Sequence, residues 1–178
     1  MRITSDFLVI GSGISGLTFA LKAAKFGKVI VLSKDKVMEG STLYAQGGIA
    51  AVVDEKNDSI SSHVKDTINA GAGLCNEEVV REIVAAGPEF VNELIDNYDV
   101  KFSNNNGELD LGLEGGHSNR RVLHANDQTG LEIESKLVKA AKNEPNIEIF
   151  ENHIAINLYV DNNVCIGAYV FDKKTKEI

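Results

Sequence analysis

The sequence has little cysteine, no long hydrophobic run and no excess of positive charge. Its two cysteines, Cys75 and Cys165, lie ninety positions apart, which matches neither a disulfide framework nor the spacing of metal ligands. No apolar stretch approaches the roughly 20 residues of a membrane helix. The acidic Asp6 precedes a short apolar run that glycines follow, which is not the pattern of a signal peptide. We therefore expect a reduced, cytoplasmic protein with no metal site and no membrane partner.

Charge and composition narrow the class of protein further. The 178 residues include 26 acidic and 18 basic side chains, which gives a net charge of −8. This balance argues against non-specific nucleic-acid binding, because such binding depends on neutralising phosphates. Hydrophobic residues make up 43% of the chain and no long polar tract interrupts them, so we expect a folded domain rather than disorder.

The chain up to Leu32 has the pattern of one strand–helix–strand unit. Residues 6–10 contain a short apolar run, residues 14–26 carry apolar side chains at helical spacing, and residues 28–32 contain a second apolar run. A strand, a tight turn, a helix and a parallel strand of this size make one βαβ unit. The pattern predicts an α/β fold with buried parallel strands.

The rest of the chain alternates helical patterns with short apolar runs. We expect Gly87-Pro88 to divide one long helical stretch, since proline favours the first turn of a helix. Thr129 and Glu132 have the spacing of a capping box. The expected elements are a loop at 33–48, a strand at 49–53, a turn at 54–59, helices at 60–71, 77–98 and 129–142, a strand at 147–150, a hairpin of 154–160 with 164–171, and a turn at 172–177. A third strand would begin at Ile178, so we expect the N-terminal part of a longer protein.

Residues 11–16 read Gly-Ser-Gly-Ile-Ser-Gly, which is the G-x-G-x-x-G fingerprint of dinucleotide-binding turns. The fingerprint follows an expected strand and opens an expected helix, and this context makes it specific. Gly11 permits the tight turn, Gly13 lets a pyrophosphate approach the backbone, and Gly16 lets helix and strand pack closely. The N–H groups and positive dipole end of the helix would hold the phosphates. The alternative is a glycine-rich turn with no ligand.

The residues after the second strand bear on which dinucleotide binds. An NAD site usually carries an acidic residue there. This sequence has Ser33 and Lys34 instead, which weakens the case for NAD. Lys34 could face the 2′-phosphate of NADP, lie beside the adenosine of FAD, or be a solvated surface lysine.

A second glycine-rich segment occupies residues 39–51 (EGSTLYAQGGIAA). An NAD domain does not need such a segment, whereas a flavin needs backbone N–H groups along its ring edge and phosphates. The segment resembles the succinate dehydrogenase, fumarate reductase and L-aspartate oxidase flavoprotein family, in which S-T-x-x-A-Q-G-G-I-A lies along FAD. The resemblance covers nearly the whole chain, through 62–67 (SHVKDT), 70–73 (AGAG), 114–118 (EGGHS), 120–125 (RRVLHA) and 127–130 (DQTG).

This resemblance implies an α/β, Rossmann-like FAD-binding domain with a parallel sheet, helices on its faces and a β-meander, incomplete at the C-terminus. It implies FAD as the cofactor, and a capping domain and C-terminal segments that residues 1–178 do not contain. The residues that it would place at FAD are Gly11, Ser12, Gly13, Ile14, Ser15, Gly16, Lys34, Ser41, Thr42, Leu43, Tyr44, Ala45, Gln46, Gly47, Gly48, Ile154 and Ala155.

Two positions separate the branches of the family. Ser41 stands where succinate dehydrogenases and many fumarate reductases carry the histidine that bonds covalently to FAD, so the resemblance implies a non-covalent cofactor. Glu114 stands before Gly115-Gly116, where aspartate oxidases have a glutamate and the dicarboxylate enzymes lack one. A carboxylate there would accept a charge-assisted hydrogen bond from the α-ammonium group that aspartate has and succinate lacks. We therefore predict Glu114 as the catalytic-site residue; the alternative is an exposed loop acid.

The aspartate oxidase branch implies oxidation of L-aspartate to iminoaspartate, the first step of NAD biosynthesis. Oxygen or fumarate would be the electron acceptor, and quinolinate synthase would be a pathway partner. The arginine and histidines that do most of the work in the family lie on later segments. Two alternatives remain open: a fumarate reductase or succinate dehydrogenase-like flavoprotein, which Ser41 and Glu114 disfavour, and a non-catalytic dinucleotide-binding module, which Lys34 would suit.

Several other polar side chains have two interpretations. His117, Arg120, Arg121 and His124 form either a basic site for substrate carboxylates or a loop that is salt-bridged to nearby acids. We expect His63 to be a surface or packing residue on a helix, and His153 to be structural. Both cysteines are expected to pack as small apolar residues.

Overall fold

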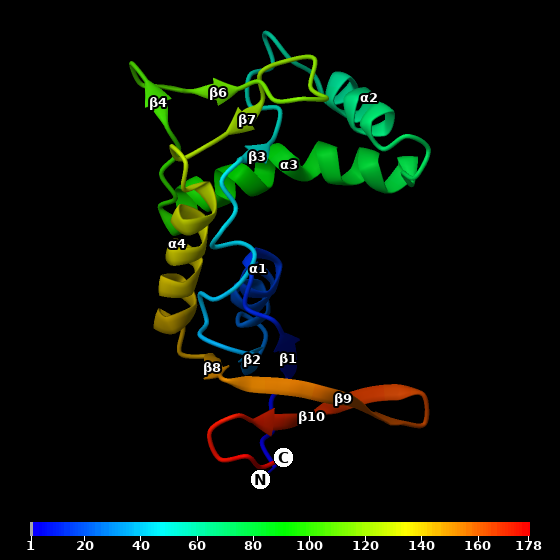
Figure 1. The fold of residues 1–178 in the computed structure, drawn as a ribbon, viewed down its shortest axis with the longest axis vertical. Helices are drawn as coiled ribbons and strands as arrows, with labels where there is room; N and C mark the ends of the chain where they lie inside the picture. Colours follow the sequence, from blue (N-terminus) through cyan, green and yellow to red (C-terminus); the bar gives the residue numbers. More distant parts are fainter. Residues whose placement is uncertain (1) are drawn as a thin grey trace. The chain divides into compact units, whose positions relative to one another are not determined.

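The computed structural model of the protein describes residues 2–178. The chain divides into two compact units. The first unit comprises the chain up to Tyr44 together with Ile133–Ile178, and the second comprises Ala45–Glu132. Figure 1 shows the helices and strands of both. No helix within residues 2–178 is both long and apolar enough to cross a bilayer.

The first unit contains a three-stranded parallel sheet with the strand order β1-β2-β8. Strand β1 (Phe7–Ile10) leads into helix α1 (Ile14–Ala23), and β2 (Val29–Ser33) returns parallel to β1. Strand β8 (Ile147–Glu151) pairs with the other edge of β2. The predicted βαβ unit and the predicted strand near residue 147 are therefore confirmed.

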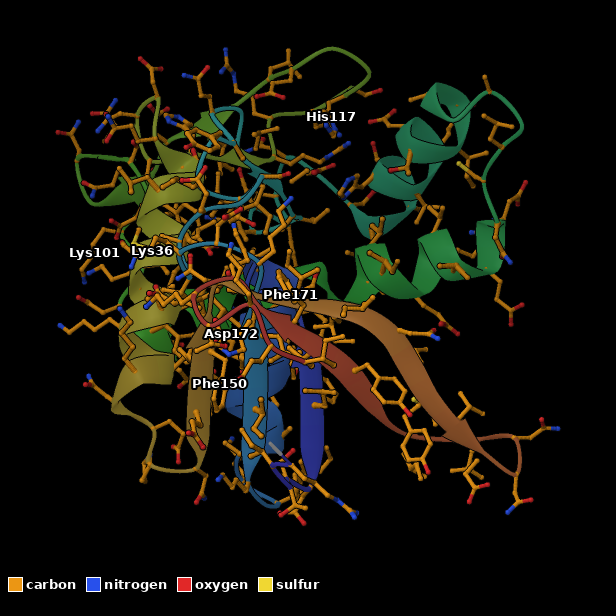
Figure 2. The ribbon with its side chains drawn as sticks, turned by 60° about the horizontal axis from the view of Figure 1, so that its bottom comes forward. Lys36, Lys101, His117, Phe150, Phe171 and Asp172 are labelled. Atoms are coloured by element: carbon orange, nitrogen blue, oxygen red, sulfur yellow. The ribbon has the colours of Figure 1, made fainter. Side chains whose placement is uncertain are left out.

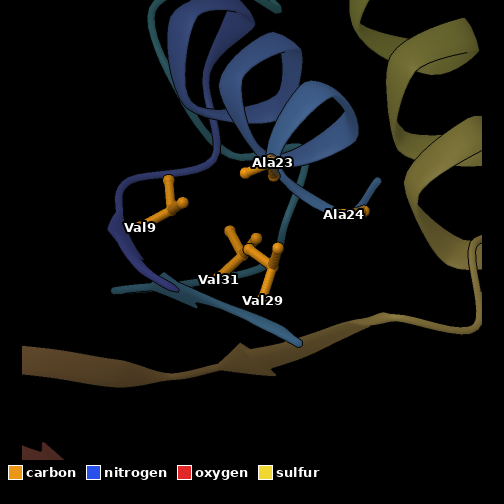
Figure 3. Close-up of a cluster of buried hydrophobic side chains, with 6 residues drawn as sticks. Val9, Ala23, Ala24, Val29 and Val31 are labelled. Atoms are coloured by element: carbon orange, nitrogen blue, oxygen red, sulfur yellow. The ribbon is translucent and has the colours of Figure 1, made fainter. Parts of the chain in front are cut away.

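The core of this unit lies between α1 and the sheet. Small side chains on α1 allow the helix backbone to approach the valines of β1 and β2, and close packing of this kind excludes water from the strand face. Helix α1 ends at Ala23, three residues before the predicted end, and Phe26 beyond it is exposed. The buried residues of this core are Val9, Ala20, Ala23, Ala24, Val29 and Val31 (Figure 3).

The two predicted buried strands differ in burial. Every residue of β2 is buried, as expected for the central strand of a parallel sheet. In β1 only Val9 is buried, whereas Leu8 and Ile10 are exposed. The expectation of a fully buried first strand is wrong, because β1 is an edge strand and the described residues cover only its α1 side.

A long hairpin follows β8 in the first unit. Strands β9 (His153–Asp161) and β10 (Val164–Asp172) pair antiparallel, which confirms the predicted hairpin and supplies two strands of the expected meander. Asn162 and Asn163 form its turn with φ angles of 47° and 61°, a conformation that asparagine tolerates better than most residues. In Figure 2, Phe171 and Asp172 mark the end of β10, and Phe150 lies on β8.

Helix α4 (Thr129–Asn143) starts where the sequence predicted, but the capping box is wrong. The Thr129 hydroxyl accepts the Ala125 N–H at 3.0 Å, and Glu132 Oε1 accepts the Lys101 N–H at 2.8 Å. A capping box would instead join these two residues reciprocally. The Glu132 N–H already donates to the Gln128 carbonyl, so helical hydrogen bonding begins one residue earlier.

The second unit contains two helices and short antiparallel strands. Helix α2 (Ile60–Ala70) is capped by the Ser59 hydroxyl, and helix α3 (Glu77–Tyr98) is capped by the Asn76 side chain. Strands β3 (Ile49–Ala50), β7 (Val122–Leu123) and β6 (Leu111–Gly112) form one sheet in that order, and β4 (Asn104–Asn105) pairs with β5 (Glu108–Leu109). The strand predicted at 49–53 is thus shorter than expected.

Helix α3 runs without interruption through Pro88, so the predicted division at Gly87-Pro88 is wrong. Proline removes one helical hydrogen bond, which favours a break when nothing else holds the helix. Here Val84, Val91 and Leu94 are buried on one face on both sides of Pro88. Packing along that face keeps the two halves in one helix.

Candidate functional site

The fingerprint turn has the geometry that its glycines predict. Gly11 adopts φ +109°, which side-chain-bearing residues rarely adopt, and its N–H donates to the Leu32 carbonyl at 2.9 Å. A Cβ on Gly16 would collide with the carbonyl oxygen of Gly11, so only glycine lets the helix start this close to the strand. The turn is therefore held in one shape by β2 and by close backbone packing.

The N-terminus of α1 is open to an anion. Gly13 is the extended N-cap residue and supplies no side-chain cap of its own, and the first turn carries no acidic residue. The Ile14 N–H donates to Thr42 Oγ1 at 3.1 Å, which joins the turn to the second glycine-rich segment. Around Gly11, a Cβ would meet no atom within 4 Å. A helix start whose N-cap residue has no side chain, with open space beside it, fits a dinucleotide diphosphate.

Ser12 connects the fingerprint to the loop after β2. Its buried hydroxyl donates to the Val37 carbonyl at 2.7 Å and lies 3.1 Å from Ser33 Oγ. Glu151 at the end of β8 accepts the Val37 N–H at 2.9 Å and pairs with Lys36 at 3.2 Å. Val37 and Glu151 therefore hold this loop beside the fingerprint turn, and no local sequence pattern identified either residue.

The loop after β2, which contains Lys34, contacts the segments that flank the hairpin of β9 and β10. Lys34 is exposed directly after β2, and its carbonyl accepts Lys173 Nζ at 3.1 Å. The neighbouring Asp35 carbonyl accepts the Asn152 N–H at 3.0 Å, which brings the start of β9 to the carboxyl end of β2. Such strand ends are where α/β sheets bind nucleotides. The contact of Lys34, Ile154 and Ala155 with an adenosine stays a prediction.

Most residues of the predicted flavin segment are exposed. Ser41 to Tyr44 belong to the first unit, where Thr42 contacts the helix start and the Tyr44 hydroxyl donates to Glu39 at 2.8 Å. This hydrogen bond and the negative charge of Glu39 raise the pKa of Tyr44. The residues Ala45, Gln46, Gly47 and Gly48 begin the second unit and are exposed.

Glu114 lies beside that segment within the second unit. A Cβ on Gly47 would lie 3.6 Å from Glu114 Oε1 and 3.9 Å from Oε2. The side chain is exposed, and no hydrogen bond or ion pair engages its carboxylate among residues 2–178. Its position is set by a turn in which the His117 N–H donates to the Glu114 carbonyl. The structure therefore brings an available carboxylate next to the A-Q-G-G sequence.

Arg121 is fully buried and forms ion pairs with two aspartates of the second unit. Its Nε and Nη2 donate to the two carboxylate oxygens of Asp58 at 2.7 and 2.8 Å, and its Nη1 donates to Asp66 at 2.7 Å. The same Nη1 lies 3.1 Å from His117 Nδ1. This bidentate geometry links α2 and the preceding turn to β7.

The pKa values of these groups favour the charged forms. Burial alone would raise the pKa of Asp58, but hydrogen bonds from Arg121, Asn119 and the backbone lower it overall. The Ser118 N–H and hydroxyl lower the pKa of Asp66 against the effect of burial, and Arg121 lowers it further. The pKa of Arg121 is raised, mainly by Asp58. The guanidinium of Arg121 is therefore paired with the carboxylates of both Asp58 and Asp66. It is not available to bind a substrate carboxylate.

The other basic candidates also contact protein groups. Arg120 donates to the Leu111 carbonyl at 3.2 Å, and His124 Nε2 lies 3.6 Å from Asp110. His117, labelled in Figure 2, contacts Arg121 and the ring of His63 at a centroid distance of 5.6 Å. Of the two interpretations, the structure favours the salt-bridged loop over a basic substrate site.

The remaining histidines and cysteines are structural or surface residues. His63 is buried, which confirms a packing role; burial lowers its pKa most, followed by the charge of Arg121. His153 Nδ1 lies 2.8 Å from the Glu151 carbonyl, as a structural residue would. Cys75 is partly buried, but Cys165 is exposed, so its predicted packing is wrong. Within residues 2–178, no cluster of three His, Cys, Asp or Glu side chains could hold a metal ion.

Comparison with known sequences places these features in a family. The family model described as FAD binding domain matches residues 6–178. L-aspartate oxidase of Vibrio cholerae is 47% identical over 184 residues, which cover 97% of this chain and 34% of that protein. The chloroplastic L-aspartate oxidase of Arabidopsis thaliana is 47% identical over 177 residues, which cover 97% of this chain and 27% of that protein. The chain thus spans about a third of the length of the curated relatives it matches.

Solved structures of similar proteins have the same fold. A quinol fumarate reductase FrdA of E. coli superposes with a TM-score of 0.90 at 28% identity, over 97% of this chain and 30% of that one. Sdh1 of Mycobacterium smegmatis superposes with a TM-score of 0.88 at 29% identity, over 96% of this chain and 31% of that one. With the fingerprint turn, the open helix start and the family match in agreement, the chain belongs to the FAD binding domain family, and FAD is its cofactor.

Proposed function

We propose that the full-length protein is a flavin-dependent oxidase that converts L-aspartate to iminoaspartate. The observation that carries this proposal is the available carboxylate of Glu114 beside Gly47. The relatives named L-aspartate oxidase support it through their 47% identity over almost the whole of this chain. FAD, when bound, supplies the chemistry by accepting a hydride from the substrate α-carbon.

The residues of this chain hold the cofactor through backbone groups. Gly11, Gly13 and Gly16 shape the turn, and the N–H groups at the start of α1 other than that of Ile14, which donates to Thr42, are suited to the diphosphate. Residues 41–48, most of which are exposed, are suited to the rest of the cofactor, and the loop that Ser12 and Glu151 order is suited to the adenosine end.

Glu114 would orient the substrate. A carboxylate that lacks a protein partner can accept a charge-assisted hydrogen bond from the α-ammonium of aspartate. Succinate and fumarate carry no such ammonium, so the same carboxylate would repel or ignore them. Glu114 therefore distinguishes an amino acid from a plain dicarboxylate at this place.

Glu114→Gln tests this role, because the amide keeps the shape of the side chain and loses its charge. A hydrogen bond to a charged group contributes roughly 1.5–3 kcal/mol, so kcat/KM for aspartate should fall by about tenfold to a hundredfold. Fumarate and succinate should bind as well as before or better. The measurement is steady-state kinetics of the full-length protein with aspartate, and binding of fumarate and succinate as inhibitors.

The matched control is Glu82→Gln, which changes an exposed glutamate on α3 of the same unit. It should leave kcat/KM and FAD content unchanged. An equal loss for aspartate and fumarate in Glu114→Gln would identify a packing defect and would remove the basis for choosing aspartate as the substrate.

A second test concerns how FAD is attached. Ser41 is exposed, and a hydroxyl cannot form the histidine–flavin bond that the resemblance places there, so we propose that FAD is non-covalent. Acid precipitation of the full-length protein should leave all of the yellow colour in the supernatant. Flavin that remains in the pellet after washing would contradict this prediction.

The competing function is a dicarboxylate oxidoreductase. It is favoured by the similarity in fold to the fumarate reductase FrdA, with its TM-score of 0.90. Parallel assays with aspartate and with succinate separate the two functions. Turnover of succinate without turnover of aspartate would replace our proposal with this alternative.

The acceptor, the pathway partner and the location of the protein stay predictions. We propose oxygen or fumarate as the acceptor of electrons from the reduced flavin, and quinolinate synthase as the enzyme that uses the product. A cytoplasmic location is the expectation for this chain, although the Arabidopsis relative is named chloroplastic.

A further inference from the structure

Glu134 on α4 is a buried carboxyl group with no hydrogen-bond partner of ordinary geometry. Its side chain is 1% exposed, and neither Oε1 nor Oε2 is paired within residues 2–178. Ile133, Leu137 and Val138 of the same helix are buried as well, so the carboxyl lies among the core-facing residues of α4. An ionised carboxylate in such a place loses its hydration without compensation, and the neutral acid is favoured.

Glu134 can change its protonation near neutral pH. Burial raises the pKa of Glu134 to about 7, and the nearby Thr42 hydroxyl opposes this effect only in part. No charged or titratable side chain of the described elements shifts the pKa of Glu134 further. The protonation of this one carboxyl is therefore decided by burial and by Thr42.

Thr42 connects Glu134 to the phosphate-binding end of α1. Its Oγ1 accepts the Ile14 N–H at 3.1 Å, and a Cβ on Gly13 would lie 3.2 Å from the same oxygen. A hydroxyl can accept one hydrogen bond and donate another, so Thr42 can turn its proton toward an ionised Glu134. Glu134, Thr42 and Ile14 all belong to the first unit. Thr42 therefore interacts both with the first N–H group of α1 and with the Glu134 carboxyl.

We propose that Glu134 is a positioning residue that acts through Thr42 and links the uptake of a proton to the binding of FAD. An ionised Glu134 and the diphosphate of FAD are two anions near one helix start, and like charges in a poorly solvated place disfavour each other. Binding of FAD therefore draws a proton from the buffer onto the Glu134 carboxylate. By linkage, affinity for FAD falls as the pH rises through neutrality.

The test is the pH dependence of FAD affinity in the full-length protein after removal of its flavin. We expect the Kd for FAD, measured from flavin fluorescence, to increase by about threefold to tenfold between pH 6 and pH 8.5. Uptake of one proton allows Kd to change by at most about tenfold per pH unit. Titration calorimetry in two buffers with different ionisation enthalpies should show net proton uptake above neutral pH. A Kd that does not change with pH in the wild-type protein would overturn the proposal.

Glu134→Gln imitates the neutral acid and cannot ionise. It should bind FAD over the whole pH range as the wild-type protein does at pH 6, and the proton uptake should disappear. The control Glu148→Gln replaces an exposed glutamate on β8 that pairs with Lys28, and it should keep the wild-type pH dependence. If Glu134→Gln retains the pH dependence and the proton uptake, another group is responsible and the proposal is wrong.

Two variants of Thr42 test the connection itself. Thr42→Ser keeps the hydroxyl and should keep the pH dependence, whereas Thr42→Val removes the hydroxyl and should weaken FAD binding and reduce the pH dependence. Full pH dependence in Thr42→Val would rule out action through this side chain. Circular dichroism verifies that each variant is folded. All of these experiments measure FAD binding and none measures the oxidation of aspartate. A negative result would therefore overturn the role of Glu134 without bearing on the proposed reaction.

Discussion

Gly13→Val should abolish stoichiometric FAD binding while the protein still folds. Gly13 is the N-cap of α1, and a Cβ there would already lie 3.2 Å from Thr42 Oγ1. The two methyl groups of valine would displace Thr42 and cover the helix N–H groups that are proposed to bind the diphosphate. We expect FAD affinity to fall by about a hundredfold or more, which corresponds to roughly 3 kcal/mol. The measurement is the flavin content of the purified full-length protein, followed by titration with FAD.

Gly167→Ala is the matched control for this substitution. Gly167 lies on β10 in the same unit and outside the predicted FAD segments, and an added Cβ there would meet nothing within 4 Å. This variant should bind FAD as the wild-type protein does. One FAD per chain in Gly13→Val would show that the glycine turn is not the phosphate site.

Arg121→Leu should cause the largest loss of stability of any single change considered. The substitution leaves the buried carboxylates of Asp58 and Asp66 without their cation. Breaking a buried ion pair by removing one partner typically costs about 3–5 kcal/mol, because the remaining charge stays desolvated. The measurement is urea-induced unfolding of the full-length protein without FAD, followed by circular dichroism at neutral pH.

Arg120→Leu is the control for Arg121→Leu, and the ion pairs of Arg121 should also make the stability of the protein depend on pH. Arg120→Leu removes an exposed side chain that donates to one carbonyl, and it should cost less than about 1 kcal/mol. The folded pKa values of Asp58 and Asp66 are lowered, so their contribution to stability is present above the unfolded pKa of about 4 and is lost as the pH falls below it. A loss in Arg121→Leu no larger than that in Arg120→Leu would contradict a stabilising role for the ion pairs.

The sequence by itself determined the features that depend on neighbouring residues. The βαβ unit at the N-terminus, the roles of Gly11 and Gly16 and the hairpin of β9 with β10 all follow from local patterns, because period, turn chemistry and the steric needs of glycine act over a few residues. The family resemblance, and with it FAD, also came from short motifs. These predictions agree with the strand order, the φ angle of Gly11 and the family match.

Only the tertiary structure decided the features that depend on distant residues. Arg121 meets Asp58 and Asp66 across 63 and 55 positions of sequence, so no local pattern could distinguish a buried ion pair from a basic substrate site. In the same way, packing of Val84, Val91 and Leu94 carries α3 through Pro88, against the local preference of proline. The pKa of Glu134 is raised by burial, and no local sequence pattern marks this glutamate as buried. Burial is a property of the folded chain, because it is set by whatever distant segments cover a residue.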